Sequence, residues 1–236
     1  MADSEQPPVP ATAAAGMEEP PLPRGVIWAY CMPSIGFSFM GMLFGIYLMK
    51  FSTDVLLIAP AAIAVLFAIG RAWDAISDPV AGYLSDRSTA RRGRRRSWMF
   101  ASAIPLGVAT LILWSPPPTL SGWTLLLWMG FALILYETAM TVFFVPYGAL
   151  GVELTKLYHE RTRLFAYRHV ISAAGSGLGL GGVYLLRTSE EPRVTAFAIA
   201  LIGGVILSAM VVTIGPGWYS LTSPSTRNSL NFSSIR

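Results

Sequence analysis

Long apolar runs separated by short polar stretches make up most of this chain. Each run holds at least about 18 residues, enough for an α-helix to cross the hydrocarbon core of a bilayer. The pattern therefore predicts an all-α fold, a polytopic membrane protein built as a six-transmembrane-helix bundle. The predicted spans are 25–49, 60–84, 97–114, 123–151, 164–186 and 194–214.

Polar sequence flanks the apolar region on both sides. Residues 1–24 are rich in proline, alanine and acidic residues and contain no apolar signal-peptide core, so we expect a disordered cytoplasmic tail. Residues 25–214 form the predicted transmembrane domain. Residues 215–236 are polar and rich in serine, and we expect them to form a C-terminal tail.

Composition narrows the classes of function. Hydrophobic residues make up 53% of the 236 residues and charged residues only 13%, whereas a soluble domain carries about 25% charged residues. This excludes an ordinary soluble enzyme, a disordered chain and a disulfide-rich secreted domain. One cysteine cannot form an internal disulfide, and two histidines cannot hold zinc without other ligands. We also expect no enzymatic activity and no cofactor.

The distribution of basic residues predicts the topology. Loop 86–96 holds six arginines and loop 153–163 three more basic residues, whereas the opposite loops hold three. By the positive-inside rule, the first two loops and both termini are cytoplasmic. Topology thus explains the formal net charge of +4. We expect a multi-pass protein of the cell membrane that contacts the lipid bilayer and binds no nucleic acid.

Five ionisable side chains interrupt the predicted spans. Facing lipid, each would cost about 2.5–3.5 kcal/mol on insertion scales, so we expect them to face the bundle interior or a wet cavity. Such a cluster fits either a functional ion site or an ion-pair network that only holds helices together. The five residues are Arg71, Asp74, Asp78, Glu137 and Arg168.

The spacing of three of these residues predicts a cation site. Arg71, Asp74 and Asp78 lie at positions i, i+3 and i+7, on one face of a helix. One arginine and two aspartates leave a formal charge of −1, which a single Na⁺ or H⁺ would neutralise, and oxygen ligands suit hard cations. Thr141 on the fourth span can add a hydroxyl oxygen. We predict Asp74 and Asp78 as the metal ligands if the cation is Na⁺.

Glu137 and the glycines of the fifth span allow more than one interpretation. Glu137 either extends the polar cavity or pairs with Arg168 of the next span. The pattern Gly177-x-Gly179-x-x-Gly182 formally fits a dinucleotide fingerprint, but it lies inside an apolar span with no preceding strand. We interpret these glycines as points where helices approach closely.

The second span and the loop after it carry a specific motif. Residues 70–87 read GRAWDAISDPVAGYLSDR, and residues 92–98 read RGRRRSW. Further matches are Pro146-Tyr147 and Tyr167-Arg168. Over residues 28–200 the chain resembles the glycoside–pentoside–hexuronide:cation symporters, the melibiose-carrier branch of the major facilitator superfamily.

This resemblance implies symport of a sugar-like solute with Na⁺, H⁺ or Li⁺ by alternating access, and hence carbohydrate and sodium ion transport. By position, Asp74, Asp78 and Thr141 match the cation site of the family, and Arg168 matches an arginine near the sugar. Arg71 and Glu137 are predicted beside it in the substrate cavity. The residues that match the cytoplasmic gating loop are Gly82, Asp86, Arg94, Arg95 and Arg96.

Two departures from the family change what we expect. Ser38 and Phe144 stand where melibiose carriers have acidic residues that hold sugar hydroxyls, and phenylalanine offers no acceptor. Animal relatives with the same second-span signature carry lysophospholipids, so a lipid-like amphipathic solute is an alternative. Family members have about twelve spans in two halves. Six spans therefore predict an N-terminal half, which either pairs with a second six-helix half or is a truncated, non-transporting membrane protein.

Overall fold

The computed structural model describes the backbone of residues 21–89, 94–155 and 157–222. Side chains are described for the same residues except 94, 96 and 212–222. Every regular element in this part of the chain is a helix. Residues 1–20 of the predicted N-terminal tail (1–24) and residues 223–236 of the predicted C-terminal tail (215–236) lie outside the described residues.

Six helices in the described part of the chain are long and apolar enough to cross a membrane, which confirms the predicted all-α, six-helix architecture. The first span is continuous from Arg24 to Val55 and is made of five consecutive helical segments. These are α2 (Arg24–Cys31), α3 (Pro33–Met42), the π-helical η2 (Leu43–Tyr47), α4 (Leu48–Lys50) and the π-helical η3 (Phe51–Val55). The others are α5 (Pro60–Arg87), α6 (Arg94–Trp114), α7 (Gly122–Glu153), α8 (Tyr158–Thr188) and α9 (Pro192–Thr222).

The end of the first span corrects a sequence prediction. The predicted span ends at residue 49, which makes Lys50 to Asp54 part of the connection to the next span, but η3 continues the helix to Val55. Lys50 pairs with Asp54 one turn later, and Ser52 donates a hydrogen bond to the Leu48 carbonyl at 2.8 Å. Polar residues therefore continue this helix beyond its apolar stretch, because their side chains bond within the helix itself.

The remaining spans also extend past their apolar cores. Helix α6 begins at Arg94, inside the predicted loop 86–96, and α8 begins at Tyr158, inside the predicted loop 153–163. Helix α9 continues to Thr222, past the predicted domain boundary at residue 214. Charged and polar residues can continue a helix at a membrane surface. The hydrophobic pattern therefore marks the part of each helix that lies in the hydrocarbon core and not the ends of the helix.

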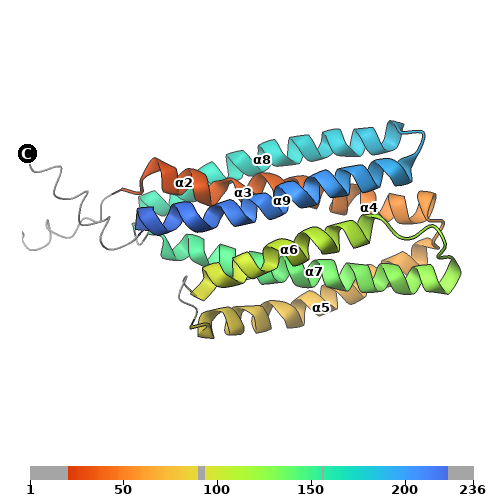
Figure 1. The fold of residues 1–236 in the computed structure, drawn as a ribbon, viewed down its shortest axis with the longest axis horizontal. Helices are drawn as coiled ribbons and strands as arrows, with labels where there is room; N and C mark the ends of the chain where they lie inside the picture. Colours follow the sequence, from red (N-terminus) through yellow and green to blue (C-terminus); the bar gives the residue numbers. More distant parts are fainter. Residues whose placement is uncertain (1–20, 90–93, 156, 223–236) are drawn as a thin grey trace, which may run out of the picture.

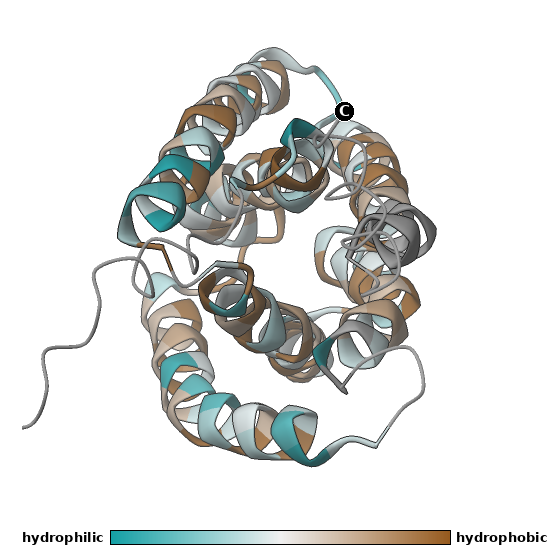
Figure 2. Cartoon of the chain, turned by 90° about the vertical axis from the view of Figure 1, so that its left-hand side faces the viewer, coloured by the Kyte–Doolittle hydropathy of each residue, from teal (hydrophilic) through white to brown (hydrophobic). Residues whose placement is uncertain are grey.

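The helices run side by side along one axis (Figure 1), with α6 packed between α7 and α9, α3 on α8, and α5 on α7. Seen end-on, apolar residues occur on outward as well as inward sides of the helices (Figure 2), as expected for surfaces that face lipid. Helix α5 is the least covered of the six spans, since only 11% of the residues in its apolar stretch are buried.

Glycines bring α8 close to α3, as the sequence predicts. A Cβ added to Gly175 would lie 2.4 Å from the Ile35 carbonyl oxygen, and one added to Gly179 would lie 2.9 Å from the Phe39 carbonyl oxygen. Gly177 and Gly181 face open space instead. Alternate glycines of the run therefore form the contact, because only one side of α8 faces α3.

Candidate functional site

The ionisable residues of α5 form a cluster with Glu137 of α7. Arg71 Nη1 donates a hydrogen bond to Asp74 Oδ2 at 3.0 Å, and Arg71 Nη2 lies 3.7 Å from Glu137 Oε1. The Arg71 side chain is 68% exposed, whereas Asp74 and Glu137 are 18% and 12% exposed. The arginine thus lies at the outer side of two largely buried carboxylates.

Asp78 is tied to α7 by a different contact. Thr141 Oγ1 donates a hydrogen bond to Asp78 Oδ1 at 2.9 Å. The hydroxyl of Ser77 lies 3.4 Å from that of Thr141. The structure thus places Thr141 beside Asp78, and Ser77 adds a third oxygen that the sequence pattern did not single out.

Asp74 has an unused acceptor. Its Oδ1 is buried and accepts no hydrogen bond from the described residues. A buried carboxylate oxygen without a partner is costly, and a bound cation would satisfy it. Counting Glu137, one arginine faces three carboxylates, so the cluster has a formal charge of −2 when all of them are ionised. Its oxygens can bind Na⁺ or a proton. The described residues hold no group of three or more His, Cys, Asp or Glu side chains close enough to bind a metal ion together.

A neighbouring contact that the sequence analysis missed fixes α5 against α7. Trp73 Nε1 donates a hydrogen bond to Thr138 Oγ1 at 2.8 Å. Thr138 donates in turn to the Ile134 carbonyl at 2.6 Å. A tryptophan inside an apolar span needs a partner for its N–H, and this requirement is the signal that could have found the contact.

Arg168 belongs to a separate cluster. Its Nη1 donates a hydrogen bond to the Tyr30 hydroxyl at 3.4 Å, and its guanidinium lies 4.7 Å from the centre of the Tyr147 ring. Tyr147 donates a hydrogen bond to the Tyr30 carbonyl at 2.7 Å. Among the described residues Glu137 forms its ion pair with Arg71, so the interpretation that Glu137 pairs with Arg168 is wrong.

The two positions that depart from the sugar-binding pattern lie on α3 and α7. The Ser38 hydroxyl is hydrogen-bonded to that of Ser172. Phe144 is partly exposed and packs edge-on against Phe37, with ring centres 4.9 Å apart. Neither side chain has a carboxylate that could accept hydrogen bonds from the hydroxyls of a sugar.

At the end of the bundle where α5 stops, Arg95 connects three helices. Its Nε and Nη2 donate to Asp86 Oδ1 at 3.0 and 2.8 Å, and its Nη1 lies 3.0 Å from Glu153 Oε1. A Cβ added to Gly82 would meet Val145 at 3.5 Å, an ordinary contact. The side chains of Arg94 and Arg96, predicted for the same gating loop, lie outside the described residues.

Comparison with known proteins gives the family. The model of the family described as MFS/sugar transport protein matches residues 29–216. The chain belongs to this family. The match includes the carboxylate cluster (Arg71, Asp74, Asp78 and Glu137), the Arg168 cluster and the contacts of Arg95.

Several relatives of this MFS family member are symporters by name. The chain is 32% identical over 157 residues to sodium-dependent lysophosphatidylcholine symporter 1-A of Danio rerio, which covers 65% of this chain and 29% of the relative. It is 37% identical over 139 residues to an uncharacterized symporter of Synechocystis, covering 57% and 26% of the two proteins. It is 35% identical over 133 residues to the inner membrane symporter YicJ of Escherichia coli, covering 56% and 29%. The matched region thus spans less than a third of the length of each of these relatives.

Proposed function

We propose that this chain is a cation-coupled secondary transporter, or the half of one that carries the cation site. The observation that carries the proposal is the pair of carboxylates on α5: Asp74 Oδ1 is buried and has no hydrogen-bond partner among the described residues, and Asp78 is oriented by Thr141 at 2.9 Å. Membership of the MFS/sugar transport family and three relatives named as symporters support it.

The coupling cation is Na⁺ or H⁺. Na⁺ would take oxygens from Asp74, Asp78 and Thr141. Thr141 keeps a lone pair for the ion, since its proton is directed to Asp78. A proton would instead bind one carboxylate and lower the repulsion within the cluster. Arg71 and Glu137 adjust the charge of the site from its outer and inner sides.

Two solute classes remain candidates. A sugar-like solute follows from the family description. A lipid-like amphipathic solute is favoured by one specific observation, the partly exposed ring of Phe144 at a position where a sugar would need an acceptor. The 32% identity to a protein named as a lysophosphatidylcholine symporter supports the second class. Arg168 can hold an anionic or hydroxyl group of either solute.

Alternating access would move this six-helix unit against its partner, and we propose that the end of α5 also shifts relative to α7. Helix α5 is little covered by the rest of the bundle, and Arg95 ties its end to α6 and α7 through Asp86 and Glu153. Breaking these charge-assisted bonds would release the end of α5. We place this end and both termini on the cytoplasmic side of a cell membrane, and we propose a second six-helix unit as the partner that completes the solute cavity.

Uptake into proteoliposomes tests the proposal. The chain is reconstituted alone and together with a candidate second half. Uptake of labelled melibiose or labelled lysophosphatidylcholine is measured with a Na⁺ gradient, with a proton gradient and with no gradient. Gradient-dependent uptake that Asp78→Asn abolishes is the expected result. Uptake that ignores both gradients, or that Asp78→Asn leaves unchanged, would refute cation coupling at this site.

A further inference from the structure

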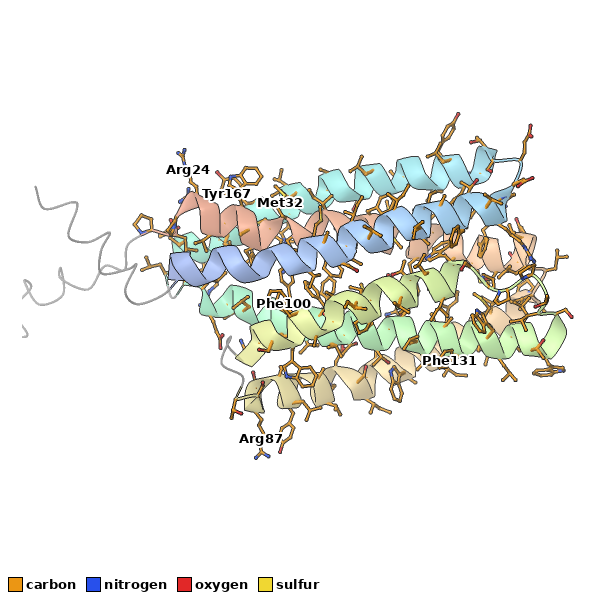
Figure 3. All side chains as sticks on the ribbon, viewed as in Figure 1. Arg24, Met32, Arg87, Phe100, Phe131 and Tyr167 are labelled. Carbon is orange, nitrogen blue, oxygen red and sulfur yellow. The ribbon has the colours of Figure 1, made fainter. Side chains whose placement is uncertain are left out.

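A cavity of about 220 Å³ lies where α2 and α8 begin, at the end of the bundle that holds Arg95. The described residues that line it come from these two helices: Arg24, Ile27, Trp28, Arg163 and Tyr167. Figure 3 shows Arg24 and Tyr167 projecting beside each other from this end of the bundle. The cavity thus combines two guanidinium groups with two aromatic rings that each have a polar edge.

The charges around this cavity do not cancel. Glu160 lies 3.3 Å from Arg163 and also accepts a hydrogen bond from the Leu22 N–H at 3.1 Å. No carboxylate in the part of the chain described here lies within ion-pairing distance of Arg24. Among the described residues, one carboxylate lies beside two guanidinium groups, so this part of the chain carries a net charge of +1 around the cavity and favours an anion.

Glu160 orients Arg163 rather than closing the cavity. The Arg163 guanidinium remains near the Tyr167 ring, 5.9 Å from its centre, and its side chain is 36% exposed. Arg24 is exposed as well. Both guanidinium groups therefore line the cavity and keep N–H donors that can be directed at one ligand.

The aromatic rings indicate the depth of the cavity in a membrane. Arg24 is the first residue of the first span, and the rings of Trp28 and Tyr167 are exposed with their centres 6.5 Å apart. Tryptophan and tyrosine at the ends of spans lie at the level of lipid headgroups. Three residues after Tyr167, Val170 is 70% exposed and begins an apolar surface on α8. An anion in the cavity would therefore adjoin a surface suited to hydrocarbon.

We propose that Arg24 and Arg163 bind the phosphate group of an anionic phospholipid of the surrounding bilayer, whose acyl chains lie along the exposed surface of α8. Guanidinium groups bind phosphate through paired, charge-assisted hydrogen bonds. Basic cavities between spanning helices on the cytoplasmic side recognise lipid headgroups. This site is separate from the carboxylate cluster, and its occupant is neither the solute nor the coupling cation.

Native mass spectrometry of the delipidated chain in neutral detergent tests the proposal. Phosphatidylglycerol and phosphatidylcholine of the same acyl composition are titrated separately, and the bound lipid is counted. We expect saturable binding of one phosphatidylglycerol. In Arg24→Gln its affinity falls about fivefold, which corresponds to about 1 kcal/mol for one basic residue at the membrane surface. Arg193→Gln, which removes an exposed arginine at the other end of the bundle, leaves the affinity unchanged.

The other arms of the experiment distinguish the alternatives. Arg24 is at the surface, so its replacement leaves the fold intact, and unfolding temperatures of both variants verify this. Equal binding of the two lipids, or equal loss in Arg24→Gln and Arg193→Gln, would overturn the proposal. Inorganic phosphate is added as a competitor; if it displaces the lipid at the same concentration, the site binds soluble phosphate and the lipid assignment is refuted. Arg163→Gln is a second variant and is expected to weaken phosphatidylglycerol binding by a similar factor.

Discussion

Replacing Asp78 by asparagine is the most direct perturbation of the carboxylate cluster. Asp78 Oδ1 accepts the hydrogen bond of the Thr141 hydroxyl at 2.9 Å. Asparagine has the same size and keeps an oxygen that can accept this bond. The substitution therefore removes one negative charge and leaves the packing between α5 and α7 in place.

The loss of this charge sets the size of the effect. A cation and a carboxylate about 4 Å apart attract each other by about 4 kcal/mol at an effective dielectric constant of about 20. Asp78 is exposed at the surface of α5, so water screens part of this attraction. If roughly one to two thirds remains, the cost is about 1.4–2.8 kcal/mol, which is about a ten- to hundredfold loss of cation affinity.

Isothermal titration calorimetry of the purified protein with NaCl measures this loss, with choline chloride keeping the ionic strength constant. Asp54→Asn is the matched control, because Asp54 pairs with Lys50 on the first span and is not part of the cluster. Wild-type Na⁺ affinity in both Asp74→Asn and Asp78→Asn would refute the assignment of the cation site. If the wild-type protein binds no Na⁺, the same variants are compared for proton uptake with a pH electrode.

Three further predictions test the contacts around the site. Thr141→Val removes the donor to Asp78 and should weaken cation binding about fivefold, near 1 kcal/mol for one hydrogen bond, by the same calorimetry. Arg95→Gln removes contacts to α5 and α7 and should speed hydrogen exchange at the end of α5. The free energy of local opening there should fall by about 1 kcal/mol, because the acidic partners of Arg95 are half exposed. Unchanged exchange would show that Arg95 does not hold the end of α5. Gly175→Ala places a Cβ 2.4 Å from a carbonyl of α3 and should lower the unfolding temperature, whereas Gly177→Ala, which faces open space, should not.

Much of the fold follows from the sequence because a bilayer constrains it strongly. Apolar length alone gives six spans, since backbone groups in lipid must bond within a helix. The same constraint is lost at the membrane surface, which is why the ends of helices are predicted poorly. The continuation of the first span through Lys50 and Asp54 depends on the ion pair between these two side chains and on the bond from Ser52 to the Leu48 carbonyl, which no hydropathy average includes.

The candidate site is predictable along one helix but not between helices. Helical periodicity places Arg71, Asp74 and Asp78 on one face of α5, and the structure agrees. Which residue faces them from α7 depends on the rotation and register of two packed helices. The sequence therefore left open whether Glu137 extends the polar cavity or pairs with Arg168, and the structure pairs it with Arg71 instead.

Polar contacts between α5 and α7 gather at the carboxylate cluster, where Arg71 meets Glu137, Trp73 meets Thr138 and Thr141 meets Asp78. Helix α5 has little other burial, so these contacts contribute much of what fixes its position. A cation on the carboxylates would compete with Arg71 for Asp74 and share the hydroxyl of Thr141. Ion binding would then change the same contacts that hold α5 against α7. In such an arrangement the free energy of ion binding acts directly on helix position, which is the physical requirement for coupling an ion to a change of access.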